Sequence, residues 1–469
     1  MSLKQLPQRF IAVSIVILAA VMIIGLCRAG AAQAQTLPQV DTHTEPGGGT
    51  FVNYQPAGPS SETGAFFQAL GTNGRTCETC HEPADAFGLS LADIQSRPLS
   101  DPLFAAVDGA DCLDQPTSHN LLLNYGLIRV MLPISPVTFT GATPNYVIKV
   151  LKDPTNCQLN NPNVQAACVQ AYGPGAQCIS VYRRPLPTTN MSFQSVLFWD
   201  GRVPSPQTIG LTAALNQVDI HATETHEQTG QPTAAQLADM AAFQEGLYST
   251  QETDAIAGSL TANGATESAQ NLANITAPAF YYGINQPLTP GFNVNAMTFF
   301  NAWSSLTGTD PVSLQEESIA RGEGLFNDLR FRVGPNPKNI SGCTGCHNDP
   351  NVGDASDVPV LMTQVANDAP NDPTLETGNY LPEFSIACPG KNQPVTLTTD
   401  PGQVLIDGNC NDVRKVKTPT LHALLAHPPY FRSGAAATLQ QVVTFYNVHF
   451  NIGMTAQQQT DMVNFLGAL

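Results

Sequence analysis

The chain has 469 residues, enough for two or three domains with a sizeable buried core. It carries 20 Lys and Arg against 37 Asp and Glu, which gives a formal net charge of −17. A chain this acidic repels nucleic acid and anionic membrane surfaces, whereas it would attract a positively charged protein partner.

The first 34 residues predict a secretory signal peptide. Lys4 and Arg9 provide a positive start, residues 10–26 an apolar stretch, and Ala32 and Ala34 a small-residue cleavage site. An uncleaved membrane anchor is the alternative, because the apolar stretch is only slightly too short to span a bilayer. Cleavage would remove three basic residues and no acid, leave no membrane span, and give the mature chain a net charge of −20. Export predicts a periplasmic protein.

The remaining chain predicts helices more often than strands. Residues 35–60 are rich in Gly and Pro and predict an extended N-terminal segment, and residues 61–71 a short helix. Residues 85–190 predict loops with brief helices. Apolar residues at helical spacing predict helices within 233–249, 313–328, 437–450 and 457–469. Thr438 and Thr455 are each followed by Gln three residues later, which predicts helix-capping boxes. Alternating β patterns are scarce, so we expect a mainly α fold.

The motif Cys-x-x-Cys-His occurs twice, in "RTCETCHEPAD" at 75–85 and "SGCTGCHNDPN" at 341–351. Two thiols on one turn can form thioethers with haem vinyl groups, and the next imidazole can bind the iron. Zinc would need a second Cys/His pair nearby, and a thioredoxin-type dithiol would need a βαβ setting, and neither is found. We therefore expect two covalently bound c-type haems, held by Cys77, Cys80, His81, Cys343, Cys346 and His347. The two motifs divide the chain into an N-terminal haem domain at 61–308 and a C-terminal one at 309–469.

Six other cysteines remain after the signal and the two motifs are set aside. An even number in an exported chain predicts three disulfides. Cys388 with Cys410 is the expected local pair. Connectivity among Cys112, Cys157, Cys168 and Cys178 stays open at this point.

Three further segments resemble the di-haem cytochrome c peroxidase/MauG family. They are "SVLFWDGRVPS" at 195–205, "ESIARGEGLFND" at 317–328 and the block from Val416 to Thr455. The resemblance covers most of the mature chain. It implies two cytochrome c-like haem domains with long loop insertions, and a tryptophan, here Trp199, that relays electrons between the haems. The other interpretation of Trp199 is a large core aromatic.

The resemblance also implies a sixth ligand for the second haem from the helix at 437–450, and the matching position is Tyr446. His449 and Met454 are the alternatives. For the first haem, His119 and Met131 are candidates. Peroxide cleavage needs a proton-transferring carboxylate or imidazole. The segment after FWDGR departs from the family spacing, so several residues are candidates: Gln217, Asp219, His221, Glu224, His226 and Glu227. Among them we favour Glu224 and His226. The other interpretation of this segment is a solvated polar loop.

Arg184 occupies the place where compact members of the family have a calcium-binding Asn, which argues against a calcium site. The resemblance implies an oxidoreductase that reduces hydrogen peroxide at one haem, with electrons arriving through the other haem from a small cytochrome or cupredoxin. A homodimer is compatible with it. The alternatives are MauG-like oxidation of a protein or organic substrate through a high-valent di-haem state, and a plain electron-transfer cytochrome.

Overall fold

The computed structural model describes residues 36–227, 230–275, 280–286, 289–333, 340–347, 362–363, 375, 379–390 and 395–469. The expected signal peptide lies outside these residues. In the part of the chain that is described, no helix is both long and apolar enough to cross a membrane.

The fold is mixed, with 35% helix and 17% strand, so the prediction of a mainly α fold is wrong. The helices are α2 (Leu91–Ser96), α3 (Asn120–Tyr125), α4 (Pro162–Tyr172), α5 (Pro206–Ile209), α6 (Leu211–Glu224), α7 (Ala234–Glu245), α8 (Ala269–Ile275), α9 (Pro311–Asp328), α10 (Val404–Asp407), α11 (Leu439–His449) and α12 (Ala456–Leu466). The short helix expected at 61–71 is a single 3-10 turn, Ala65–Phe67.

The strands belong to several small antiparallel sheets. β2 (Val40–Thr44), β3 (Thr50–Tyr54), β8 (Tyr248–Asp254) and β9 (Gly258–Ser259) form one, and β14 (Thr396–Thr398), β13 (Glu383–Ala387) and β6 (Val147–Lys152) form another. The two-stranded sheets pair β5 (Ile128–Ser135) with β7 (Gln177–Arg183), β1 (Thr36–Leu37) with β4 (Ser60–Ser61), β10 (Phe331–Arg332) with β11 (Ile340–Ser341), and β12 (Met362–Thr363) with β15 (Val416–Lys417).

Sequence periodicity misses these strands for two physical reasons. β7 is buried along nearly its whole length, so its residues do not alternate between apolar and polar. β6 pairs with β13, more than 200 residues further along the chain, and no local pattern reports such a partner. The segment from 85 to 190, predicted as mostly loop, therefore contains the three strands β5, β6 and β7.

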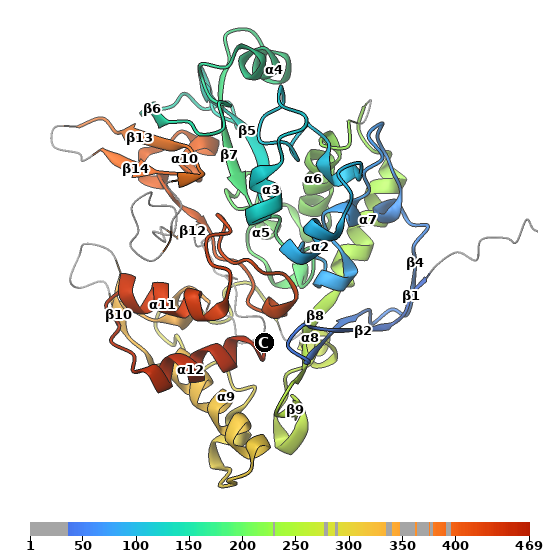
Figure 1. Cartoon of the computed structure of the whole chain (residues 1–469), viewed down its shortest axis with the longest axis vertical. Coiled ribbons are helices and arrows are strands. Elements are labelled where there is room, and N and C mark those ends of the chain that lie inside the picture. Colours follow the sequence, from blue (N-terminus) through green and yellow to red (C-terminus); the bar gives the residue numbers. More distant parts are fainter. Residues whose placement is uncertain are drawn as a thin grey trace, which may run out of the picture.

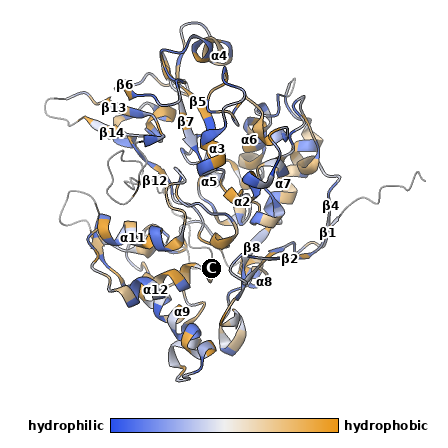
Figure 2. Cartoon of the chain, in the orientation of Figure 1, coloured by the Kyte–Doolittle hydropathy of each residue, from blue (hydrophilic) through white to orange (hydrophobic). Residues whose placement is uncertain are grey.

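The C-terminal half packs around three amphipathic helices, α9, α11 and α12 (Figure 1). Their apolar faces meet in one core that includes Trp303, Ile319, Val443 and Phe465. Figure 2 shows hydrophobic and hydrophilic stretches along each of these helices. The predicted capping box at Thr455 is present. Thr438 caps α11 through the Gln441 amide, but the Gln441 side chain instead accepts from the Ala437 amide.

Besides the two expected haem domains there is a third module, which lies at the top of Figure 1 and is held by disulfides. Strands β5, β6 and β7 share one core with β13 and α10, which come from the other end of the chain. Cys388 pairs with Cys410, as predicted. The structure also decides the open connectivity: Cys112 pairs with Cys157, and Cys168 pairs with Cys178. The division at residue 309 stays a prediction, although this module draws on both sides of it.

Candidate haem-binding sites and the junction between them

The first Cys-x-x-Cys-His motif begins in a 3-10 turn, Cys77–Thr79. Thr76 caps the turn, and the side chains of Thr76 and Thr79 each accept a hydrogen bond from the other's amide. The amides of Cys80 and His81 donate to the Cys77 carbonyl at 3.2 and 3.1 Å. This tight turn puts both thiols and the imidazole within one turn of the chain, as covalent haem attachment requires.

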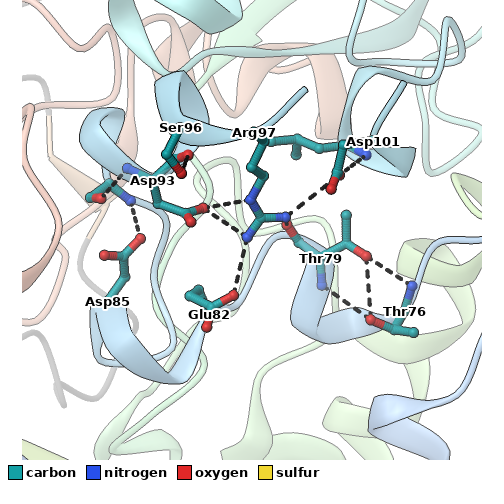
Figure 3. Close-up of polar contacts among 10 residues, drawn as sticks. Thr76, Thr79, Glu82, Asp85, Asp93, Ser96, Arg97 and Asp101 are labelled. Atoms are coloured by element: carbon teal, nitrogen blue, oxygen red, sulfur yellow. Dashed lines mark hydrogen bonds and ion pairs between the residues drawn. The ribbon is translucent and has the colours of Figure 1, made fainter. Parts of the chain in front are cut away.

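The side chain of Arg97 contacts this turn and the residues around it, as Figure 3 shows. Its guanidinium donates to the Thr79 carbonyl at 3.0 Å and contacts Asp93 at 2.7 Å and Glu82 at 3.1 Å. Asp101 lies 3.7 Å away. Arg97 thus holds both sides of the motif together, since Thr79 precedes and Glu82 follows His81.

A chain of hydrogen bonds runs from His81 into the protein. Nδ1 of His81 donates to the Phe87 carbonyl at 3.1 Å, which leaves Nε2 as the nitrogen for iron. The same carbonyl accepts from the Thr188 amide at 3.1 Å, and the Thr188 hydroxyl donates to Gln244 at 2.6 Å. Gln244 donates to Asp219 at 2.8 Å. Thr188 and Gln244 were not predicted, because their role depends on contacts between segments far apart in sequence.

Asp219 and His226 are buried beside the first motif. Burial raises the pKa of Asp219 to about 7, and the Asp219 charge, after burial, raises that of Cys77. Burial, with the charges of Arg75 and His81, lowers the pKa of His226 to about 4. Oδ2 of Asp219 and Nδ1 of His226 are buried with no hydrogen-bond partner among the described residues. The two groups can therefore exchange protons with a small molecule bound nearby.

The structure does not bring Glu224 to the same place. Its side chain is 71% exposed and lies 3.8 Å from His221, which is itself 30% exposed. Of the two favoured acid–base candidates, His226 is buried near His81 and Glu224 is at the surface. Of the remaining members of the set, Gln217 lies within α6 and Glu227 lies in the turn that follows it.

The second motif repeats the geometry of the first. A 3-10 turn covers Cys343–Gly345, and the amides of Cys346 and His347 donate to the Cys343 carbonyl at 3.1 and 2.9 Å. The ring of His347 lies 6.3 Å from that of Phe326 on α9. None of the four motif thiols is in a disulfide, whereas the other six described cysteines all are, so the residues fit covalent haem attachment.

Tyr446 lies on α11 close to the second motif. Burial, together with the thiols of Cys346 and Cys343, raises the pKa of its phenol well above the ordinary value. An anionic phenolate would therefore form here only against a cation such as haem iron. Met454 is instead buried in the core of α9, α11 and α12. His449 is exposed and lines a cavity of about 500 Å³ with Arg330, Phe331, Arg332, Phe450 and Asn451.

The candidates for a sixth ligand of the first haem have structural roles. Nδ1 of His119 donates to the Gly109 carbonyl at 2.9 Å, and the ring packs edge-on against Phe104. Met131 lies on β5 against the Cys112–Cys157 and Cys168–Cys178 disulfides.

Trp199 lies where segments from both halves of the chain meet. Its indole nitrogen donates to the Arg184 carbonyl at 2.8 Å, and its own carbonyl accepts from the Lys417 amide at 2.8 Å. The Arg184 amide donates to the Arg432 carbonyl at 2.9 Å. Trp199 is half-buried, whereas Trp303 is fully buried in the C-terminal core, so only Trp199 is placed at a junction.

Trp199 and Arg432 occupy the same position in two copies of one turn. In "LFWDGRV", Leu197 bridges to Val203, and in "YFRSGAA", Tyr430 bridges to Ala436. Each turn has a phenylalanine at positive φ, 60° for Phe198 and 65° for Phe431. A bulky residue in this region is strained and marks a site where surrounding contacts enforce the conformation. The repeated Phe-x-x-Gly pattern is a sequence signal that could have revealed the pair.

Arg184, which stands at the position that argued against a calcium site, binds backbone carbonyls. Its guanidinium donates to the carbonyls of Leu89, Gly126 and His427, the last at 2.9 Å. These oxygens have the Arg184 guanidinium as a partner, and the absence of a calcium site stays a prediction. Within the described residues, no group of three or more His, Cys, Asp or Glu side chains is arranged to hold a metal ion.

Comparisons with known proteins confirm the resemblance to the di-haem cytochrome c peroxidase/MauG family. The chain is 31% identical over 137 residues to cytochrome-c peroxidase IdrP2 of Denitromonas iodatirespirans, covering 27% of this chain and 36% of the relative. It is 30% identical over 159 residues to cytochrome-c peroxidase IdrP2 of Pseudomonas sp. (strain SCT), covering 33% and 42%. The matched part thus spans about two fifths of these relatives. No family model matches the chain.

A solved structure, of a MauG-like protein associated with microbial copper homeostasis, aligns over 86% of this chain and 87% of its own. The sequence identity is 13% and the TM-score is 0.35, which is too distant to define the fold.

Proposed function

We propose that the protein is a periplasmic di-haem c-type peroxidase, which reduces hydrogen peroxide at one haem with electrons that arrive through the other. The single observation that carries the proposal is Trp199, which is hydrogen-bonded to Arg184 and Lys417 where the N-terminal and C-terminal halves of the chain meet. The peroxidase names of the relatives support it. The three disulfides support an oxidising compartment such as the periplasm.

The residues of the first site would divide the work as follows. Cys77 and Cys80 would hold the haem, and His81, oriented by the Phe87 carbonyl, would bind its iron through Nε2. When bound, the haems would supply the iron that binds peroxide and the electrons that reduce it. Asp219 and His226, both buried with a free polar atom, would move the proton between the two peroxide oxygens. Glu224 is a weaker candidate because it is exposed.

The residues of the second site would serve electron transfer. Cys343, Cys346 and His347 would hold the haem, and Tyr446 would lie on its other side or bind its iron. Trp199 would relay electrons between the haems, and the acidic surface would attract a basic electron donor, a small cytochrome or cupredoxin.

Two measurements test the proposal. The pyridine haemochrome spectrum should show two c-type haems per chain, and the protein should oxidise a reduced cytochrome only when peroxide is present. If both haems stay low-spin and peroxide leaves the spectrum unchanged, the protein is an electron carrier and the peroxidase proposal is wrong.

A second function, oxidation of a protein or organic substrate, is favoured by one observation. Tyr446 stands at the position where the family has Met or Tyr, and an iron-bound tyrosinate stabilises oxidised iron. In that case peroxide should produce a long-lived oxidised spectrum that decays on adding a substrate, in place of rapid turnover with reduced cytochrome.

A further inference from the structure

A buried cluster of five charged side chains lies under the turn that carries Trp199. Arg183 contacts Asp400 at 2.7 and 3.0 Å and also forms an ion pair with Asp200. Nε of Arg202 lies 3.4 Å from Asp200, and Nε of Arg432 lies 2.9 Å from Asp400. Four of the side chains are at most 2% exposed, and Arg202 is 13% exposed.

The cluster contains one positive charge more than its carboxylates can balance. Burial alone would raise the pKa of both carboxyls, but Arg183 and Arg432 hold that of Asp400 at about 2, and Arg202 and Arg183 lower that of Asp200. Both carboxylates are thus ionised at neutral pH, and three guanidiniums face two buried negative charges. Glu224, whose charge also acts on Arg202, is 71% exposed and lies outside the cluster. An unbalanced buried charge is strongly unfavourable, so a further anion is expected.

Arg432 is the member of the cluster whose two terminal nitrogens have no partner among the described residues. Its side chain is 2% exposed, and both terminal nitrogens, Nη1 and Nη2, are buried with no hydrogen-bond partner in the described structure. The neighbouring Ser433 hydroxyl is also buried without one. Two parallel N–H groups of a guanidinium match the two oxygens of a carboxylate. Arg432 is tied to the Trp199 segment through the Arg184 amide.

We propose that Nη1 and Nη2 of Arg432 bind a carboxylate that the polypeptide does not supply, and that in the loaded protein this is a propionate of one haem. The identity of the propionate rests on the proposed function, whereas the carboxylate site rests on the cluster alone. A small free carboxylate has the same chemistry, and the experiment separates the two sources.

The test compares holoprotein of the wild type, Arg432→Gln, Arg432→Lys and the control Arg321→Gln, which removes an arginine paired with Asp461 elsewhere. The midpoint potential of each haem is measured by spectroelectrochemistry between pH 6 and 8. A cation beside a propionate disfavours the ferric state, so Arg432→Gln should lower the midpoint potential of one haem and make it more dependent on pH. Arg432→Lys should restore most of the potential, and the control should leave both haems unchanged.

The other outcomes are also decisive. If acetate raises the wild-type melting temperature but not that of Arg432→Gln, while both potentials are unchanged, the site takes a free carboxylate. If neither potential nor melting temperature responds, the proposal is overturned. If Arg432→Gln does not fold, Arg432→Lys takes its place, and the haem propionate bending mode in its resonance Raman spectrum should differ in frequency from that of the wild type. An unchanged frequency would exclude a propionate as the bound carboxylate. A wild type without haem would refute the proposed function, and the acetate arm would still test the site.

Discussion

The indole nitrogen of Trp199 donates a 2.8 Å hydrogen bond to the carbonyl of Arg184, whose amide in turn donates to the carbonyl of Arg432 at 2.9 Å. This pairing links the turn of the FWDGR segment to its copy in the C-terminal block. It holds the tryptophan in one orientation where the N-terminal and C-terminal halves of the chain meet. A fixed orientation is what an electron relay needs, because the rate of transfer depends on distance and geometry.

Replacing Trp199 with Phe should slow electron transfer and leave the haem sites intact. We expect peroxide-dependent oxidation of a reduced cytochrome to fall about tenfold, equivalent to about 1.4 kcal/mol on the barrier. Haem content and the first reaction with peroxide should stay at wild-type values. Trp303→Phe is the matched control: it should keep turnover but lose roughly 1–3 kcal/mol of stability, because Trp303 is fully buried in the core. Equal turnover in both variants would exclude the relay.

Replacing Tyr446 with Phe tests the second site. If the phenolate binds iron, one haem should lose its tyrosinate ligand in the variant and change its spin state. The change should be visible in the electronic and EPR spectra. Haem content should not change, since Cys343, Cys346 and His347 are untouched. Tyr146→Phe removes another buried hydroxyl, which has no hydrogen-bond partner in the described chain, and should leave both spectra as they are. Identical spectra for Tyr446→Phe and wild type would show that Tyr446 is not a ligand.

Asp219 should make the folded state less stable as the pH rises. Burial raises its pKa to about 7 from the ordinary value of 3.8. A raised pKa gives a stability contribution that is complete below the unfolded pKa and is lost as the pH passes through the folded one. In Asp219→Asn, which cannot ionise, the free energy of unfolding relative to wild type should therefore rise between about pH 4 and pH 7.

The same Asp219→Asn variant should react more slowly with peroxide, because it cannot accept and return a proton. Glu224→Gln serves as the control, since Glu224 is exposed, and it should change neither urea stability nor the peroxide reaction. A slow reaction in Glu224→Gln together with a normal one in Asp219→Asn would reverse our assignment.

The ion pairs of Asp400 should make the folded state less stable as the pH falls, which is opposite to the effect of Asp219. Burial alone would raise the pKa of Asp400, but the charges of Arg183 and Arg432 lower it to about 2. A lowered pKa stabilises the fold above the unfolded value, and this contribution is lost as the pH falls from about 4 to about 2. Asp400→Asn should cost roughly 3–5 kcal/mol at pH 7, because it leaves buried arginines without a partner.

Urea unfolding of Asp400→Asn measured at pH 7 and pH 3 checks this prediction, since the difference from wild type should shrink at the lower pH. Glu317→Gln, which removes a partly exposed partner of Arg321, should cost at most about 1 kcal/mol at either pH. A cost for Asp400→Asn as small as that of the control would contradict the assigned role.

Local sequence signals predicted the parts of the fold that depend on local physics. Helical spacing located α7, α9, α11 and α12, and the Thr455 capping box forms as expected. The disulfide between Cys388 and Cys410 was also predictable, because its partners are only 22 residues apart. The strands were not, because β6 meets β13 across the chain and β7 is buried without alternation.

By itself the sequence determined the chemistry that the two Cys-x-x-Cys-His motifs can perform, since thiols and imidazole at fixed spacing need no distant partner. It also singled out Trp199, Tyr446 and His226. Only the tertiary structure decided which polar groups are buried together. It placed Glu224 in solvent and connected His81 to Asp219 through Thr188 and Gln244. Among the described residues it left the terminal donors of Arg432 without a partner. Burial and long-range contact set these outcomes, and neither is encoded in the spacing of neighbouring residues.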